Sequence, residues 1–198
     1  MAGFWLWHLR LGNPLVIKAG WTALVGGLSV FYATQADGMP GRRLAIASML
    51  GSWGARLTVF LLYDRVFSRP RRGETRSFWF CQAQALSAVF FSVPAVLAVV
   101  NPDPDFSPLE FGAAALWVVG FAGEATADRE LLHFKMDPAN AGRRCESGLW
   151  RFSRHPNYMF EWVMWVAYAL FASASPLGWI AFLCPAAMAV ILARNVLS

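Results

Sequence analysis

Charged residues are scarce in this sequence, and their scarcity constrains the class of protein. They make up 15% of the 198 residues, whereas a soluble domain usually carries about 25%. Hydrophobic residues reach 57%, and the 10 Trp and 16 Phe supply the rings that anchor helices at membrane interfaces. The shortage of charge argues against an ordinary soluble domain and predicts an integral membrane protein.

Cysteine and histidine are also rare, and neither forms a cluster. The 3 cysteines lack the spacing of metal ligands and imply no disulfide framework, and the 3 histidines lie far apart. We therefore expect no metal site. The first apolar run is not followed by a clear small-residue cleavage site, so we expect no removable signal peptide.

The net charge of +5 comes mostly from arginines next to hydrophobic runs. This arrangement is typical of cytoplasmic loops that face anionic lipid head groups. The sequence has no base-reading motif and no basic stripe interleaved with aromatic residues. Membrane lipids are therefore expected partners, and nucleic acid is not.

The hydrophobic runs predict an all-α bundle of about six membrane helices, each roughly the 20 residues that cross a bilayer. The expected spans are residues 14–35, 44–67, 78–100, 107–123, 156–173 and 177–193. Ser107 and Pro108 form a typical helix start, and this helix is expected to continue as a polar extension to about Lys135. Pro94 is expected to kink the third span. Without internal repeats, residues 1–198 are predicted to form a single integral membrane domain.

Arginine asymmetry orients the predicted spans. The loops after spans two and four, residues 68–77 and 124–155, hold the arginine clusters, and the loops after spans three and five hold none. The positive-inside rule places both loops, and both termini, on the cytoplasmic or equivalent side. Arg42 and Arg43 fall on the opposite side and are discordant.

Residues 124–161 form a polar stretch between hydrophobic segments and are the first place to look for chemistry. Glu124, Asp128 and Lys135 share one face of the expected helix. A solvated juxtamembrane helix, stabilised by charge pairs, is the alternative reading of this spacing. The stretch is therefore predicted to form either a polar pocket or a charged helix surface.

A new helix is expected to begin at Pro156, because His155 before the proline is pushed out of the helical region. The free N–H groups of a helix start favour a phosphate, and arginine side chains suit phosphate oxygens. The arginines that precede this helix start are Arg143, Arg144, Arg151 and Arg154. Together they predict a pocket for the diphosphate of a nucleotide cofactor. No Gly-rich loop follows a strand, so a Rossmann site is not expected.

Two charged residues fall within predicted spans. Arg56 lies near the middle of the second span, and Glu161 lies just inside the fifth. A charge at such a depth costs at least about 2.5 kcal/mol and is a functional-site hypothesis by default. The alternative for Arg56 is a structural ion pair with Asp64 or Glu161.

The segment GLWRFSRHPNY at residues 148–158, followed by Glu161-Trp162, resembles the C-terminal signature of the steroid 5-alpha-reductase superfamily, in particular its DUF1295 branch. The resemblance covers about residues 44–175 and includes Trp53-Gly54-Ala55-Arg56-Leu57. The isoprenylcysteine and phospholipid methyltransferases are more distantly similar. They share an Arg-His-Pro-x-Tyr element but bind S-adenosylmethionine, and Asn157 with Glu161 favours the reductases.

The resemblance implies an NADPH-dependent membrane enzyme that reduces a conjugated C=C bond in a steroid- or lipid-like substrate. Its cofactor would lie in a polar cavity on the cytoplasmic side of the bundle. The candidate cofactor-binding residues are Arg56, Glu124, Asp128, Lys135, Arg143, Arg151, Arg154, His155 and Asn157. Glu161, expected near the nicotinamide, and Tyr158 are the candidate catalytic residues.

Two departures from the steroid reductases keep other functions open. Those enzymes hold the substrate carbonyl with a Glu/Tyr pair on early spans, where this sequence offers Trp53. They also usually carry a Tyr-rich basic segment after the last span, whereas this sequence ends at Ser198. The alternatives are an inactive family member that serves as a subunit of a membrane complex, with protein partners, and an S-adenosylmethionine-dependent methyltransferase.

Overall fold

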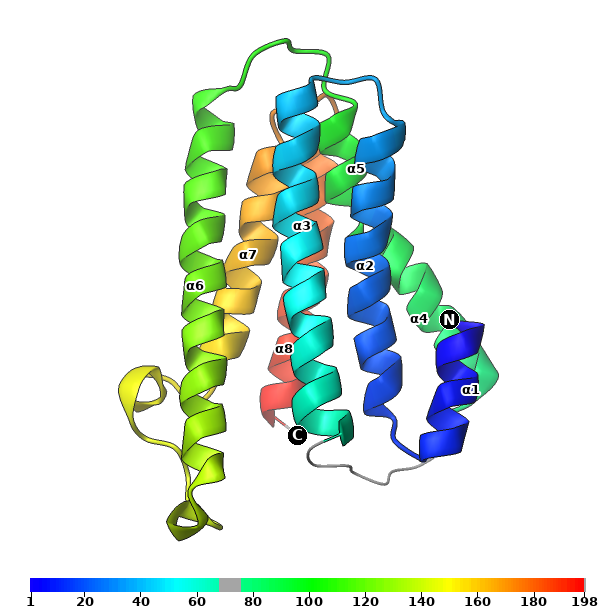
Figure 1. The fold of residues 1–198 in the computed structure, drawn as a ribbon. Helices are drawn as coiled ribbons and strands as arrows, with labels where there is room; N and C mark the ends of the chain where they lie inside the picture. The colour runs from blue at the N-terminus through cyan, green and yellow to red at the C-terminus, as the bar shows by residue number, and fades with distance from the viewer. Residues whose placement is uncertain (68–75, 198) are drawn as a thin grey trace. The chain divides into compact units, whose positions relative to one another are not determined.

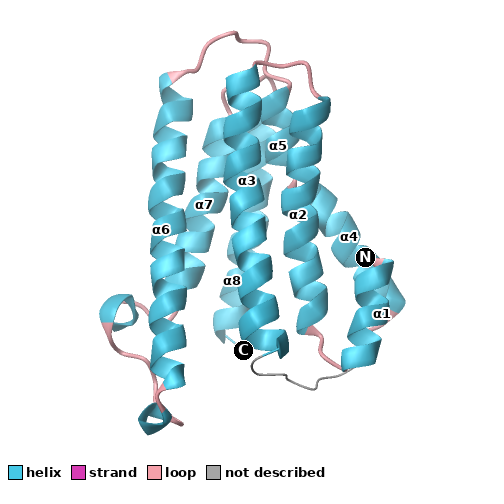
Figure 2. Ribbon diagram, viewed as in Figure 1, coloured by secondary structure: helices cyan, strands magenta, loops and turns pink. Residues whose placement is uncertain are grey.

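The computed structural model of the chain describes residues 1–67 and 76–197 (Figure 1). Over these ranges Figure 2 draws helices and loops and no strand, so the predicted all-α class is confirmed. The α-helices are α1 (Ala2–Leu11), α2 (Leu15–Gln35), α3 (Pro40–Phe60), α4 (Phe78–Phe91), α5 (Val93–Val99), α6 (Pro108–Met136), α7 (Pro156–Ala172) and α8 (Leu183–Leu197). A π-helix, η1 (Leu61–Phe67), follows α3, and short 3₁₀ helices are η2 (Pro138–Asn140), η3 (Gly148–Arg151) and η4 (Gly178–Phe182).

Three helical segments are long and apolar enough to cross a membrane, among the residues that the structure describes. They are Leu15–Gln35, Pro40–Asp64 and Phe78–Val99, with mean hydropathies of 1.5, 1.4 and 1.6. Gly178–Arg194 is apolar but shorter. These segments support the prediction of a membrane protein. Of the predicted basic loop at 68–77, residues 68–75 lie outside the described part of the chain.

The predicted starts of α6 and α7 are confirmed. The Ser107 hydroxyl accepts a hydrogen bond from the Glu110 backbone N–H, and the Glu110 carboxylate accepts one from the Ser107 N–H, forming a capping box. Helix α6 then extends without interruption to Met136, which confirms its polar extension. Helix α7 begins at Pro156, where the missing N–H costs nothing.

Other boundaries differ from the prediction. The N-terminal segment forms the helix α1, which was not among the expected spans, and α3 already begins at Pro40, before the second span expected at residues 44–67. The expected third span is divided at Ser92 into α4 and α5, which run in different directions in Figure 1. Pro94 lies in the first turn of α5, so the predicted kink is a break between two helices.

The contacts divide the chain into two compact units, Met1–Asp105 and Phe106–Ser198. In the first unit α2 and α3 cross closely through glycines. A methyl group added at Gly54 would lie 2.9 Å from the Thr22 carbonyl oxygen and 3.0 Å from Gly26 Cα. The hydroxyls of Thr22 and Thr58 are 2.7 Å apart across the same crossing. Small residues and interhelical hydroxyls are typical of helix pairs in membranes.

An aromatic core fills the rest of the first unit. The ring of Trp21 meets those of Trp53 and Phe91 edge to face, at centroid distances of 6.2 and 5.3 Å. The Trp21 indole N–H donates to the Ser87 hydroxyl at 2.9 Å. Trp53 is completely buried. Edge-to-face rings add to the stability from burial, so this core fixes α2, α3 and α4 against one another.

The discordant pair Arg42 and Arg43 has structural partners. Arg42 is buried and donates to the carbonyl oxygens of Asp103 and Asp105 at 2.7 and 2.6 Å. Arg43 donates to the Ala33 carbonyl oxygen at 2.6 Å, near the C-terminal end of α2. A cation there satisfies terminal carbonyls and favours the helix dipole. These arginines therefore stabilise the turns between helices, which explains why they depart from the loop-charge pattern.

In the second unit α6 packs along α7 (Figure 1). A methyl group added at Gly120 would lie 2.7 Å from Met164 Cγ and 3.2 Å from the Phe160 carbonyl oxygen. Further along, the Trp117 indole N–H donates to the Tyr168 hydroxyl at 2.9 Å. The close contact holds the polar end of α6 beside the start of α7.

Candidate functional site

Asp128 of α6 and Asn157 of α7 bring together the two parts of the predicted polar stretch. The Asn157 side-chain amide donates to a carboxylate oxygen of Asp128 across 3.5 Å. The carboxylate accepts only, so the amide N–H₂ of Asn157 must face it and the amide oxygen points elsewhere. That oxygen is buried and has no hydrogen-bond partner among residues 1–67 and 76–197. The polar end of α6 and the first turn of α7 therefore meet at these two residues.

Glu124 places a second carboxylate one turn before Asp128 on α6. Both residues are buried, with 3% and 5% of their surface exposed. They share a face of α6 with Gly120 and Ala127, which are also buried. Lys135, at the far end of the helix, is exposed. The alternative of a fully solvated charged helix is therefore wrong for Glu124 and Asp128 and fits only the end of α6.

A short turn anchors the loop to α6 just before α7. The Leu149 backbone N–H donates to the Glu130 carboxylate at 2.9 Å, and the Trp150 indole N–H donates to the Ala127 carbonyl oxygen at 2.9 Å. Gly148 has a φ of 56°, and a side chain there would collide with Glu130. Sequence reasoning missed Glu130 as a positioning residue. The glycine at the start of the signature was the available signal for a close approach.

The start of α7 holds His155 and Tyr158 in a fixed arrangement. The His155 backbone N–H donates to the Ser153 hydroxyl at 3.2 Å, and His155 adopts the extended φ of −144° expected before proline. The rings of His155 and Tyr158 are stacked, with centroids 5.3 Å apart and planes 11° apart. The two rings therefore present one continuous aromatic surface beside Arg154.

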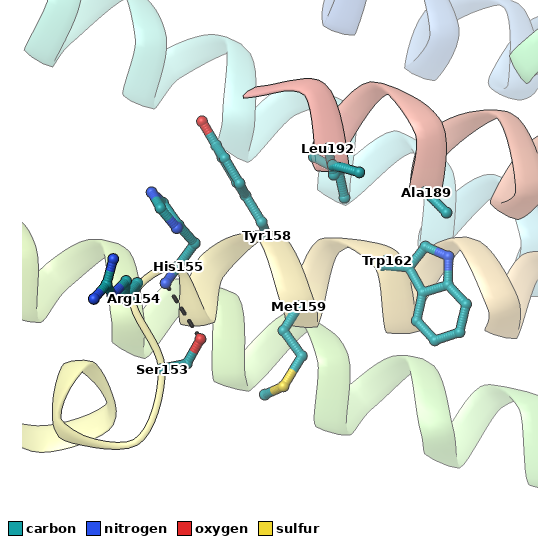
Figure 3. Close-up of a pocket in the computed structure, with 9 residues that line it drawn as sticks. Ser153, Arg154, His155, Tyr158, Met159, Trp162, Ala189 and Leu192 are labelled. Carbon is teal, nitrogen blue, oxygen red and sulfur yellow. Dashed lines mark hydrogen bonds between the residues drawn. The ribbon is translucent and has the colours of Figure 1, made fainter. Parts of the chain in front are cut away.

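A groove of about 360 Å³ lies between α7 and α8 (Figure 3). In Figure 3 the rings of His155 and Tyr158 project from α7 on the side along which α8 runs. Ala189 and Leu192 line the groove from α8. The residues that α7 and the preceding loop contribute are Ser153, Arg154, His155, Tyr158, Met159 and Trp162. Sequence reasoning placed Arg154, His155 and Tyr158 on a pocket wall but did not foresee α8 as the opposite wall.

The predicted arginine cluster is dispersed. Arg143 and Arg144 are exposed and line a separate recess of about 400 Å³ with Glu146 and Ser147. The guanidinium of Arg151 lies over the ring of Phe152, 5.0 Å from its centroid. Spacing in the sequence indicated that these arginines approach the α7 start together, but Arg143 and Arg144 share one recess, Arg151 lies over Phe152 and Arg154 lines the groove.

The two charged residues predicted to lie within membrane spans are both half-buried. Glu161 is half-buried on α7, one turn after Asn157. Arg56, in the first unit, is half-buried and lines an apolar recess of about 490 Å³ with Val59, Phe60 and Tyr63. An arginine beside a recess agrees with the expectation that Arg56 faces a partner, a cavity or a ligand.

A family described as "Protein of unknown function (DUF1295)" matches residues 4–196. The chain belongs to the DUF1295 family. This family is part of the steroid 5-alpha-reductase-like group, which agrees with the resemblance drawn from the signature at residues 148–162. No curated protein and no solved structure matches the chain significantly.

One buried polar atom at the α7 start of this DUF1295 chain is left without a hydrogen-bond partner among the described residues. The buried amide oxygen of Asn157 has no donor in the structure, and such an atom costs free energy unless a ligand or water satisfies it. A nicotinamide carboxamide carries the N–H₂ donor that this oxygen needs. Among the described residues, His, Cys, Asp and Glu form no group of three or more that could hold a metal ion.

Proposed function

We propose that this DUF1295 protein is an NADPH-dependent membrane reductase that reduces a C=C bond in a steroid- or lipid-like enone. The observation that carries the proposal is the contact of Asp128 with Asn157, which leaves the Asn157 amide oxygen buried and unsatisfied. The resemblance of the signature to the steroid 5-alpha-reductases supports the same chemistry.

The residues fall into groups that suit different parts of the cofactor. Asn157, oriented by Asp128, would accept from the nicotinamide carboxamide, with Glu124 forming the buried wall beside it. Positive charge on the loop side suits the cofactor phosphates. By resemblance the residues of the second unit that contribute it are Lys135, Arg143 and Arg151. His155 and Arg154 would complete the wall at the α7 start.

When bound, NADPH supplies a hydride to the β carbon of the enone. The chain supplies orientation and a proton near the substrate carbonyl. Tyr158 and Glu161 lie one turn apart on α7, and both are half-buried, so solvent reaches them only in part. Each side chain carries a group that can donate a proton to the substrate carbonyl or polarise it. We propose them as the catalytic residues.

The same proposal includes a membrane arrangement. The three apolar segments identified in the first unit, together with α6, α7 and the segment from Gly178 to Arg194, would make about six spans. Residues 124–155 and both termini would then face the cytoplasmic or equivalent side, by the positive-inside rule. Cysteine labelling from either side of sealed vesicles, at Arg144→Cys and at Asp103→Cys, tests this sidedness.

Cofactor binding tests the reductase proposal directly. The full chain, purified in detergent, is titrated with NADPH and separately with S-adenosylmethionine. We expect NADPH to bind saturably. Asn157→Ala and Asp128→Ala should each weaken its affinity about tenfold, because each variant loses one charge-assisted or buried hydrogen bond. The control is Arg129→Gln, an exposed residue of α6. Binding of S-adenosylmethionine alone would instead identify a methyltransferase.

A second candidate function is a structural subunit of a membrane complex. Trp53 stands where the steroid reductases hold the substrate carbonyl, and it is completely buried in the aromatic core against Trp21. A side chain fixed in this way supplies no carbonyl-binding group from α3. Failure to bind either cofactor, together with stoichiometric copurifying proteins, would favour this function.

A further inference from the structure

The groove between α7 and α8 has a polar end and an apolar end. At the polar end lie Arg154, which is exposed, and the stacked rings of His155 and Tyr158. At the other end the Trp162 indole N–H donates to the Pro185 carbonyl oxygen at 3.0 Å and ties α7 to the first turn of α8. The groove therefore changes from cationic to apolar along the direction of α7 (Figure 3).

The lining residues follow the spacing of single helix faces. On α7, Tyr158 and Met159 are adjacent and Trp162 follows one turn later, and His155 is the residue just before the helix. Helix α8 contributes Ala189, Leu192 and Ala193, at i, i+3 and i+4. The side chains of the two alanines are short, which leaves space between α7 and α8 at these positions.

We propose that this groove binds the substrate as a single-chain amphiphile with an anionic head. The head would contact Arg154 and the rings of His155 and Tyr158, and the chain would extend past Met159 to Trp162. The inference deepens the proposed function by naming the substrate class, and it places the head beside Tyr158, the proposed catalytic residue. The binding itself requires no NADPH.

Charge complementarity selects the anionic head. Among the residues that the structure describes, one arginine and one histidine line the groove, and no acidic residue does. An arginine fork prefers a carboxylate or phosphate, whereas a cationic head would face Arg154 directly. The volume of about 360 Å³ falls at the lower end of the range of about 300 to 1,000 Å³ typical of small-molecule sites, which favours one chain over two.

The direction of the groove also matches that of a lipid in a bilayer. Its polar end lies in the loop before α7, and its apolar end lies along a helix with no charged residue after Glu161. Charged heads lie at the membrane interface and apolar chains in the hydrocarbon. An amphiphile taken from the membrane would enter the groove in its membrane orientation.

Photo-crosslinking tests this inference on the purified full chain without NADPH. The probe is a stearic acid that carries a diazirine near the middle of its chain, and mass spectrometry maps the labelled peptides. We expect label in peptides containing Met159–Trp162 and Ala189–Ala193, with competition by stearate and not by octadecanol. Arg154→Gln should weaken stearate competition about fivefold, about 1 kcal/mol at 25 °C. The exposed control Arg129→Gln should not.

A second variant fills the groove without changing its charge. Ala189→Trp should abolish labelling. An unaltered chain that binds NADPH but takes no label would overturn this inference alone, whereas one that takes label but binds no NADPH would count against the proposed function alone. Label outside these peptides, equal competition by octadecanol, or unaltered labelling of Ala189→Trp would overturn the inference. Competition by inorganic phosphate alone would show a simple anion site and would overturn it as well.

Discussion

Asp128 and Asn157 meet side chain to side chain across α6 and α7, with the Asn157 amide donating to the Asp128 carboxylate at 3.5 Å. The two residues are separated by 29 positions in the sequence. Their contact joins the buried carboxylate face of α6 to the first turn of α7. It therefore couples the stability of the polar end of the second unit to the orientation of the Asn157 amide.

The charge at this contact gives the first prediction. Asn157→Ala removes the hydrogen bond and should destabilise the protein by about 1 kcal/mol. Asn157→Asp has almost the same shape but places a second carboxylate against Asp128, so it should destabilise the protein more. Thermal unfolding in detergent measures both. Equal losses from the two variants would contradict a carboxylate–amide contact.

The double exchange Asp128→Asn with Asn157→Asp is the control for that prediction. It restores a carboxylate facing an amide, so it should recover much of the stability lost in Asn157→Asp. NADPH binding should recover with it, because a carboxylate at position 157 still offers an acceptor to the nicotinamide carboxamide. Recovered stability without recovered NADPH binding would contradict the role of this acceptor in the cofactor site.

The turn before α7 gives a second prediction. Gly148 has a φ of 56° and lies against the Glu130 carboxylate, which accepts from the Leu149 N–H at 2.9 Å. Gly148→Ala combines the cost of a left-handed backbone, about 1 to 2 kcal/mol, with displacement of Glu130. We expect a lower unfolding temperature and weaker NADPH binding, because the loop is detached from α6.

Gly142→Ala provides a matched control for the turn. Gly142 has a φ of 75°, but no atom lies within 4 Å of an added methyl group. It should show the backbone cost alone, with unchanged NADPH binding. If Gly142→Ala weakened binding as much as Gly148→Ala, the contact with Glu130 would not be what positions the loop.

The helix boundaries were predictable because their signals are local. Ser107, Pro108 and Glu110 lie within one turn, and together they determine where α6 begins. Pro156 similarly determines the start of α7. The break at Ser92 was only partly predictable. Proline interrupts the hydrogen bonding of a helix, but neighbouring helices decide whether the result is a kink or two separate helices.

The site was less predictable because its contacts are not local. The bond from Leu149 to Glu130 joins residues 19 positions apart, and no periodic pattern indicates it. The loop arginines illustrate the same limit. Arg151 turns onto Phe152, whereas Arg143 lines a different recess. Sequence spacing shows that charges are near one another along the chain, but the loop backbone determines where each guanidinium points.

Arg42 gives a third prediction, because its charge serves the fold. Only 1% of its surface is exposed, and its guanidinium donates to two carbonyl oxygens of the turn at Asp103 and Asp105. Arg42→Met keeps the apolar stem but leaves those carbonyls without their donors. We expect a loss of about 3 kcal/mol in unfolding free energy.

Arg144→Met is the comparison for Arg42. Arg144 is exposed in a loop, so its replacement should change the unfolding free energy by less than about 0.5 kcal/mol. Both variants remove one positive charge, and thermal unfolding in the same detergent compares them. If Arg42→Met and Arg144→Met lost similar amounts of unfolding free energy, Arg42 would contribute only through net charge and not through its hydrogen bonds to the turn.

The glycine crossing of α2 and α3 gives the last prediction. An added methyl group at Gly54 would lie 2.9 Å from the Thr22 carbonyl oxygen and 3.0 Å from Gly26 Cα, both backbone atoms that cannot rotate away. Gly54→Ala should therefore separate the helices and destabilise the protein by about 1 to 3 kcal/mol.

Gly27 lies on the same helix as Gly26 but has no atom within 4 Å of an added methyl group. Gly27→Ala should be neutral or stabilising by up to about 1 kcal/mol, since alanine favours the helix. Thermal unfolding that ranked the two variants in the opposite order would show that α2 and α3 do not cross at these glycines.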